Sequence, residues 1–220
     1  MNNCFHESLL NKPAVKQAID LFHQVYYLTN QTRSNPSWMG YPTLKCPLDM
    51  WVYQELINEI KPDVIIESGT FHGGSALYMA MICDMLNNGE IITVDVVSRD
   101  PHPEHSRIKY LLGSSTSNKI IGQIENIIED KKNIMVILDS EHKKEHVLQE
   151  LNIYHKYIES GGYLIVEDTN VNGHPVRPNW GEGPMEALDA FLRSNDNFEI
   201  DLSREKFIMT QNPRGYLRRK

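Results

Sequence analysis

Apolar, β-branched runs alternate with segments of helical periodicity through most of the chain. Short runs that are apolar at nearly every position are typical of strands buried on both faces, and their alternation with helices indicates a mostly parallel sheet covered on both sides. The predicted strands span residues 64–68, 91–96, 108–113, 134–140 and 163–169. The predicted helices span residues 75–86, 116–129, 143–159 and 184–193. The pattern therefore predicts an α/β fold.

The two ends of the chain differ from this alternation. Residues 198–203 and 207–210 are short runs only three residues apart, too close for a crossover helix, so they predict an antiparallel hairpin. Five βα units closed by a hairpin are typical of the Rossmann-like sheet of class I methyltransferases, whereas a dinucleotide dehydrogenase would continue with another parallel strand. Before the sheet, helices are expected at residues 13–27 and 48–60, on either side of an irregular segment.

The first predicted strand ends in an acidic residue and a glycine-spaced turn, Glu67-Ser68-Gly69-Thr70-Phe71-His72-Gly73-Gly74-Ser75. Glycines allow positive φ and close approach of a ligand to the backbone, and the following helix begins with unpaired N–H groups. The spacing is neither G-x-G-x-x-G nor a Walker loop. An acid beside the first glycine indicates a ligand with positive charge or donor groups, and S-adenosylmethionine has both. The turn makes Thr70, Phe71 and Gly73 candidate cofactor contacts beside Glu67 and Gly69.

The ends of the next two strands also carry polar residues, where ligands of open α/β sheets bind. Asp95 ends an apolar strand, and a carboxylate there can accept both hydroxyls of an adenosine ribose; a helix-cap or turn aspartate is the less favoured interpretation. Ser114 follows the third strand and either borders the adenine or forms part of a helix cap before Thr116. The sequence leaves these two roles of Ser114 equally open.

Acidic residues follow the fourth and fifth strands. If these strands are neighbours, Asp139, Glu167 and Asp168 meet in a small volume, where converging carboxylates repel unless something positive lies among them. A hard divalent cation such as Mg²⁺ suits oxygen ligands of this kind. The alternative is that one acid caps a helix and the others face solvent. His142, three residues after Asp139, is either a residue of the first helical turn or a candidate general base.

Composition limits the remaining functions. The net charge of −7 and the pI near 5.7 argue against a broad nucleic-acid surface, which needs a basic face. No apolar stretch is long enough for a signal peptide or a membrane span, and the three cysteines are scattered, so we expect a cytoplasmic protein with reduced thiols. We expect residues 1–50 to form a lid or an oligomer contact and residues 51–220 to form the S-adenosylmethionine-binding catalytic domain.

Taken together, these motifs resemble the cephalosporin hydroxylase/rhamnosyl O-methyltransferase family. The resemblance covers residues 38–217 and is carried by the segments KPDVIIESGTFHGGS (61–75), LDSEH (138–142), GYLIVEDT (162–169), GP (183–184) and NPRGYL (212–217). It implies an S-adenosylmethionine-dependent, Mg²⁺-requiring enzyme of natural-product chemistry. It also implies that Asp139, Glu167 and Asp168 bind the metal. The implied cofactor-binding positions are Glu67, Gly69, Ser75, Asp95 and Ser114, and we add Asp139 as a further candidate.

The predicted reaction is methyl transfer from S-adenosylmethionine to a hydroxyl of a sugar or another small natural product. Mg²⁺ chelated by neighbouring acceptor hydroxyls would lower the pKa of one of them, with Asp139 and His142 as the predicted catalytic residues. Two other classes remain: a nicotinamide-dependent oxidoreductase, which would also use Asp95, and a cofactor-binding tailoring protein that works through a partner enzyme. A homo-oligomer is expected, without nucleic-acid or membrane partners.

Overall fold

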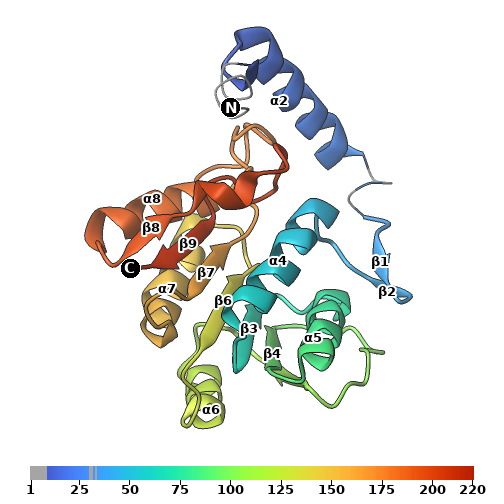
Figure 1. Ribbon diagram of the computed structural model, residues 1–220, viewed down its shortest axis with the longest axis vertical. Helices are drawn as coiled ribbons and strands as arrows, with labels where there is room; N and C mark the ends of the chain where they lie inside the picture. Colours follow the sequence, from blue (N-terminus) through green and yellow to red (C-terminus); the bar gives the residue numbers. More distant parts are fainter. Residues whose placement is uncertain (1–8, 30–31, 33) are drawn as a thin grey trace.

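A single seven-stranded sheet forms the centre of the computed structural model, which describes residues 9–29, 32 and 34–220 (Figure 1). Its strand order is β5-β4-β3-β6-β7-β9-β8. Five strands run parallel, namely β3 (Val64–Ser68), β4 (Glu90–Asp95), β5 (Ile108–Leu112), β6 (Ile134–Leu138) and β7 (Tyr163–Val166). The last two, β8 (Phe198–Ile200) and β9 (Tyr216–Arg219), are antiparallel to their neighbours. The predicted α/β fold class is confirmed.

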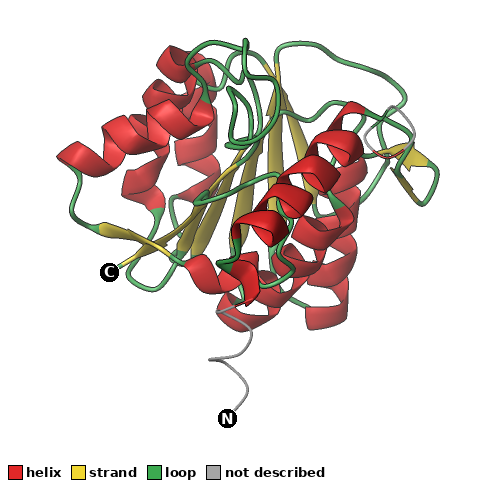
Figure 2. Ribbon diagram, turned by 90° about the horizontal axis from the view of Figure 1, so that it is seen from above, coloured by secondary structure: helices red, strands yellow, loops and turns green. Residues whose placement is uncertain are grey.

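Helices cover both faces of the sheet, as Figure 2 shows from above. One face packs against α6 (Asn118–Ile128), α7 (Lys144–Tyr154) and α8 (Pro184–Ser194). The other packs against α4 (Pro47–Ile60) and α5 (Gly74–Leu86). Successive residues of β3 alternate between the two layers: Val64 and Ile66 lie in the first core and Ile65 in the second. A strand buried on both faces needs such a continuous apolar run.

The N-terminal helix α2 (Pro13–Leu28) stands apart from these layers, at the top of Figure 1. Tyr27 of this helix is buried against Val171 and Val176 of the loop after β7, and His23 contacts Asn170 of the same loop (Nε2 to Nδ2, 3.0 Å). A two-stranded hairpin, β1 (Ser37–Trp38) with β2 (Tyr41–Pro42), and short 3₁₀ turns at His155–Tyr157 and Leu202–Glu205 complete the described elements. None of the described helices has both the length and the apolarity needed to cross a membrane.

The second strand of the predicted C-terminal hairpin was placed wrongly. Residues 207–210 form turn and irregular structure, and β8 pairs instead with β9, where Phe198 faces Arg219. The reason lies in the polar groups of this segment: the Thr210 hydroxyl and the Gln211 N–H donate to the two oxygens of buried Asp49 (2.5 and 2.9 Å). These bonds hold the segment in a loop, and the antiparallel pair forms later in the chain.

Candidate active site

A cavity of about 470 Å³ opens at the carboxyl ends of the parallel strands, which is where ligands of this fold class bind. Several predicted site residues line it, namely Gly69, Phe71, Asp95, Ser114, Asp139, His142 and Asp168. Strands β6 and β7 end at Leu138 and Val166, earlier than predicted, so the acids that follow them lie on loops at the mouth of the sheet. Of the other predicted residues, Glu67 is fully buried, and Thr70 lines a neighbouring cavity that Asp95 also lines.

The glycine turn comes into direct contact with the loop after β6. Gly69 has φ +94°, and a Cβ there would lie 1.9 Å from the carbonyl oxygen of Asp139. Only glycine tolerates both the conformation and the proximity. Gly73, with φ +77°, precedes the first turn of α5 and leaves its N–H groups open, whereas Ser75, inside α5, is buried away from the cavity. The turn thereby joins the predicted cofactor residues to Asp139.

Asp95 ends β4 and holds this turn in place. Its Oδ2 accepts the N–H of Phe71 (2.9 Å), its Oδ1 accepts the N–H of Val97 (3.0 Å), and Arg99 lies 3.4 Å away. A carboxylate at this position therefore has a structural role in addition to the predicted contact with a ribose. Ser114 lines the cavity, and its carbonyl accepts the hydroxyl of Ser117, the N-cap of α6 (2.8 Å). Its contact with the adenine stays a prediction.

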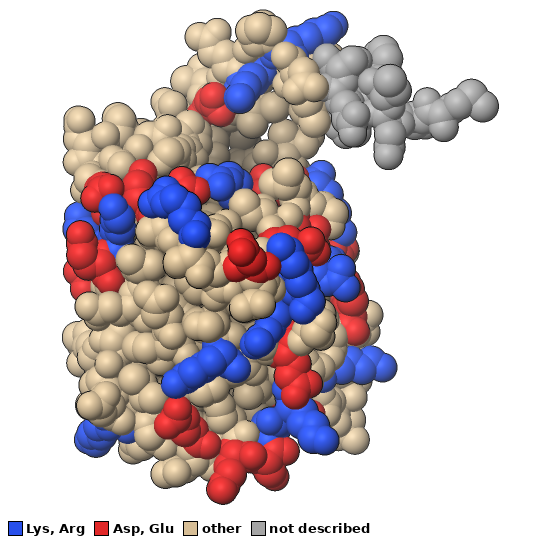
Figure 3. Space-filling model, turned by 90° about the vertical axis from the view of Figure 1, so that its left-hand side faces the viewer, with Lys and Arg blue, Asp and Glu red and all other residues tan. Residues whose placement is uncertain are grey.

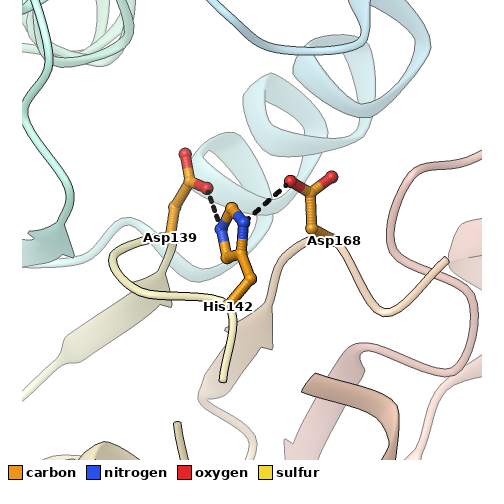
Figure 4. Close-up of side chains that lie close together, drawn as sticks. All are labelled: Asp139, His142 and Asp168. Carbon is orange, nitrogen blue, oxygen red and sulfur yellow. Dashed lines mark hydrogen bonds and ion pairs between the residues drawn. The ribbon is translucent and has the colours of Figure 1, made fainter. Parts of the chain in front are cut away.

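His142 lies between two carboxylates (Figure 4). Its Nε2 is 3.1 Å from Asp139 Oδ1 and its Nδ1 is 3.2 Å from Asp168 Oδ2. Burial alone would lower the pKa of His142, but Asp168 and Asp139 outweigh it and raise the pKa to about 9. His142 precedes the first residue of α7 and is held by a side chain from another loop, because the indole N–H of Trp180 donates to its carbonyl oxygen (2.7 Å).

The same three residues are a candidate metal centre within the described part of the chain. One ligand atom each from Asp139, His142 and Asp168 lies within 4.8 Å of the others, so a single ion could contact all three. Carboxylate oxygens are the ligands that Mg²⁺ prefers. The structure therefore brings Asp139 and Asp168 together as predicted, whereas the third predicted acid, Glu167, lies beside Asp139 on the side of Lys45 and is not one of these three residues.

Glu167 is bound to Lys45, a residue that sequence analysis did not single out. The Lys45 ammonium contacts Asp139 Oδ2 (2.5 Å) and Glu167 Oε1, and lies 3.8 Å from Glu67 Oε1. Burial and the repulsion of Asp139 raise the pKa of Glu167 to about 8, while Lys45 opposes that rise. Lys45 lies just before α4 in the segment predicted to be irregular, where no periodic pattern indicates which side chains point inward.

A polar network forms the wall of the cavity near Ser114. Buried Glu150 of α7 accepts the hydroxyls of Ser115 (2.6 Å) and Ser140 (2.8 Å), and His146 lies 3.6 Å away. These three partners of Glu150 line the cavity. Sequence analysis missed this network too, although His146 and Glu150 at i and i+4 on a predicted helix would have shown that they share one face.

Comparison with known proteins gives the family. A model described as Rhamnosyl O-methyltransferase/CmcI matches residues 30–220. The curated relatives include the rhamnosyl O-methyltransferase of Mycobacterium leprae, 38% identical over 207 residues that cover 90% of this chain and 89% of the relative. That of Mycobacterium tuberculosis strain H37Rv is 38% identical over 203 residues, covering 89% of this chain and 82% of the relative.

Solved structures share the fold. An apo-structure of CmcI superimposes with a TM-score of 0.63 at 23% identity and covers 84% of this chain and 76% of its own. The O-methyltransferase TomG from Streptomyces achromogenes reaches a TM-score of 0.53 at 14% identity, covering 90% and 85%. The predicted family and enzyme class are therefore confirmed. The chain belongs to the rhamnosyl O-methyltransferase/CmcI family and has the fold of the S-adenosylmethionine-dependent methyltransferases.

Proposed function

We propose that the protein transfers a methyl group from S-adenosylmethionine to a hydroxyl of a sugar or another natural-product small molecule, with Mg²⁺ bound at the acidic site. The observation that carries this proposal is the position of Asp139, His142 and Asp168 in the same cavity as Gly69 and Asp95. Cofactor residues and candidate metal ligands thus border one space. Relatives at 38% identity named as rhamnosyl O-methyltransferases support a sugar acceptor.

The cofactor half of the cavity suits S-adenosylmethionine. Asp95 presents a carboxylate at the end of β4, where it can accept ribose hydroxyls, and the turn at Gly69 lines the same cavity. Ser114 and Phe71 line the same half. A related CmcI structure was solved with Mg and SAM, which supports this pair of cofactors.

The donor set suits Mg²⁺, because two carboxylates that border the same cavity present hard oxygen ligands. Asp139 and Asp168 would hold the ion, and Glu167 is the third proposed ligand, which requires it to leave Lys45. When bound, a divalent cation acts as a Lewis acid that orients acceptor hydroxyls and lowers their pKa.

His142 is the proposed general base, oriented by the bond from Trp180 to its carbonyl. Without a cation, Asp139 and Asp168 contact both ring nitrogens and raise the pKa of His142 to about 9, so it could act as a base only once a cation draws these carboxylates away from the ring. It would then take the acceptor hydroxyl proton as the oxygen attacks the methyl group of the sulfonium. A positioned base contributes a factor of about 10²–10⁴ to the rate. Asp168 contacts the other ring nitrogen and holds the ring plane.

The surface agrees with a small-molecule acceptor. On the face shown in Figure 3, basic and acidic side chains are interspersed and do not gather by sign, whereas nucleic-acid binding needs a basic patch. The N-terminal segment keeps its proposed role as a lid or an oligomer contact, which the exposed apolar residues Leu21, Phe22, Val25 and Leu28 of α2 support.

Methyl transfer assays with the purified protein test the proposal. We expect turnover of S-adenosylmethionine with rhamnose-containing glycosides, loss of that turnover with a chelator, and recovery with Mg²⁺. Asp168→Asn should lower both metal dependence and rate while S-adenosylhomocysteine affinity survives. Full activity in exhaustively chelated protein would refute the role of the metal. Turnover only after addition of a second protein would favour a partner-dependent tailoring role.

A further inference from the structure

A buried carboxylate lies behind the wall of the cavity near Ser114. Glu150 of α7 is 0% exposed, and its Oε1 accepts the hydroxyl hydrogens of Ser115 (2.6 Å) and Ser140 (2.8 Å). Both serines line the cavity, whereas Glu150 does not. We call these two serines the serine wall. It joins the loops after β5 and β6, because both hydroxyls donate to the same carboxylate oxygen.

We propose that Glu150 is a positioning residue that orients the serine wall to recognise the amino group of the cofactor's adenine. In this role the carboxylate takes the hydroxyl hydrogens inward and leaves the hydroxyl oxygens as hydrogen-bond acceptors toward the cavity. The proposal rests on the proposed function, because the adenine is that of the S-adenosylmethionine proposed to bind there. It involves none of the proposed metal ligands.

The first step of the argument is the direction of the hydrogen bonds. A serine hydroxyl has one hydrogen to donate and two lone pairs that accept, and an ionised carboxylate only accepts. The hydrogens of Ser115 and Ser140 therefore both point to Glu150, and the serine wall offers a ligand acceptors alone. A matching ligand group must donate. Adenine has one such group, the amino group at N6, because its other ring nitrogens accept.

His146 strengthens this arrangement. Its Nε2 lies 3.3 Å from Ser115 Oγ and 3.6 Å from Glu150 Oε1, and the interaction with Glu150 raises the pKa of His146. A raised pKa favours the protonated ring, in which both nitrogens are donors. The ring then gives Glu150 a positive partner, and it offers Ser115 no acceptor to which the hydroxyl could turn instead.

The second step is the cost of burying this carboxylate. Within the described part of the chain, Glu150 Oε2 has no hydrogen-bond partner. A buried polar atom without a partner destabilises the fold, and a neutral side chain would avoid the buried charge. The effect of the acid on the hydroxyls explains its presence, since it accepts from both at once and offers neither of them a hydrogen.

The third step is the position of the serine wall relative to Asp95. Ser115 follows β5, the neighbour of β4, and Asp95 ends β4. If Asp95 binds the ribose, the sulfonium must extend toward the metal ligands after β6 and β7, because its methyl group has to reach the acceptor there. The base is attached to the other side of the ribose and therefore extends toward β5. Ser140 follows β6, but its hydroxyl meets that of Ser115 at one oxygen of Glu150.

The experiment compares two ligands on three proteins. S-inosylhomocysteine carries a carbonyl oxygen where S-adenosylhomocysteine carries the amino group, so it presents an acceptor to the acceptors of the serine wall. Glu150→Gln keeps the shape of the side chain but offers the hydroxyls hydrogens as well as an acceptor. Glu145→Gln is the matched control, because Glu145 is an exposed residue of the same helix. Isothermal titration calorimetry measures the affinity of each protein for both ligands.

We expect the wild type to bind S-adenosylhomocysteine about 100-fold more tightly than S-inosylhomocysteine, or better. This ratio should fall about tenfold or more in Glu150→Gln, because the hydroxyls can then turn a hydrogen toward the carbonyl oxygen of the inosine base. Glu145→Gln should keep the ratio. A merely structural role of Glu150 would weaken both ligands equally, so an unchanged ratio in folded Glu150→Gln would overturn the proposal.

Ser140→Ala decides the case if Glu150→Gln does not fold. It removes one acceptor and leaves Glu150 with Ser115 and His146, and we expect the ratio to fall here too. An unchanged ratio in this variant, or a wild type that binds both ligands equally tightly, would overturn the proposal. Failure of the wild type to bind S-adenosylhomocysteine would instead refute the proposed cofactor site, and the proposal would fall with it.

Discussion

Asp95→Asn tests whether the carboxylate at the end of β4 binds the ribose of the cofactor. In the structure, both Asp95 oxygens face backbone N–H groups, of Phe71 and Val97, and the side chain also borders the cavity. An amide keeps one oxygen and replaces the other with an NH₂ group. The variant therefore loses the negative charge and one acceptor that a ribose hydroxyl would use.

The expected loss is at least one hydrogen bond to a charged group, worth about 1.5–3 kcal/mol. At about 1.4 kcal/mol for each factor of ten, S-adenosylhomocysteine affinity should fall about 10- to 150-fold. Isothermal titration calorimetry with S-adenosylhomocysteine measures it directly. Asp100→Asn is the control: Asp100 lies on the same loop, contacts Ser98 and His102, and has a side chain that is 80% exposed.

The bond to Phe71 requires a second measurement. Its loss would also loosen the glycine turn, so the free energy of unfolding of both variants should be measured by urea denaturation. A reduced affinity together with nearly unchanged stability assigns the effect to the ligand. An Asp95→Asn protein that binds S-adenosylhomocysteine as tightly as the wild type would refute the assignment, and Asp95 would keep only its role in holding the turn.

Three further variants test the supports of the site. Gly69→Ala should lower the free energy of unfolding in urea by about 2–5 kcal/mol, because its Cβ would meet the Asp139 carbonyl at 1.9 Å in a conformation unfavourable for alanine; a stable variant would contradict this. Trp180→Phe should lower kcat about 2- to 12-fold through the lost bond to the His142 carbonyl and leave S-adenosylhomocysteine affinity unchanged. Glu186→Gln tests pH dependence: although burial opposes it, hydrogen bonds hold the pKa of Glu186 at about 2, so the carboxylate stabilises the fold above pH 4.5 and that stability is lost as pH falls through 2. At pH 7 the free energy of unfolding of the wild type, measured by thermal or urea unfolding, should exceed that of Glu186→Gln by about 1–3 kcal/mol. This difference should shrink toward pH 2, and a difference that does not change with pH would contradict the reasoning.

The central strands could be predicted because burial on both faces leaves a clear signal. Every residue of β3 and of β6 is buried; β6 is apolar throughout, and β3 is apolar up to Glu67 and Ser68 at its carboxyl end. The ends of these strands were harder to place. Residues 139–140 and 167–169 were predicted to extend the strands before them, but the chain leaves the sheet earlier. Side chains there bind to other loops instead; for example, the Thr169 hydroxyl donates to the Pro213 carbonyl (2.7 Å).

The C-terminal pair shows what a local pattern omits. Residues 207–210 have strand-like composition, yet the strand that forms is β9, inserted between β7 and β8. Its Leu217 faces Leu164 of β7 on one side and Ile200 of β8 on the other. Residues 207–210 stay out of the sheet because Thr210 and Gln211 bind the two oxygens of buried Asp49. Asp49 lies far from them in the sequence. Such partners cannot be inferred from spacing.

The candidate site, too, could be predicted only in part. The sequence predicts that acids converge at the ends of β6 and β7 and that something positive must lie among them, and a divalent cation was the partner inferred from the oxygen ligands alone. The structure adds a second positive group, Lys45, from a segment without periodicity. One ammonium is shared among Glu67, Asp139 and Glu167, and burial raises the pKa of both glutamates. On the side that faces the cavity, Asp139 and Asp168 flank His142, whose raised pKa makes it a further positive group. A cation that enters from the cavity therefore competes with this imidazolium for the two aspartates.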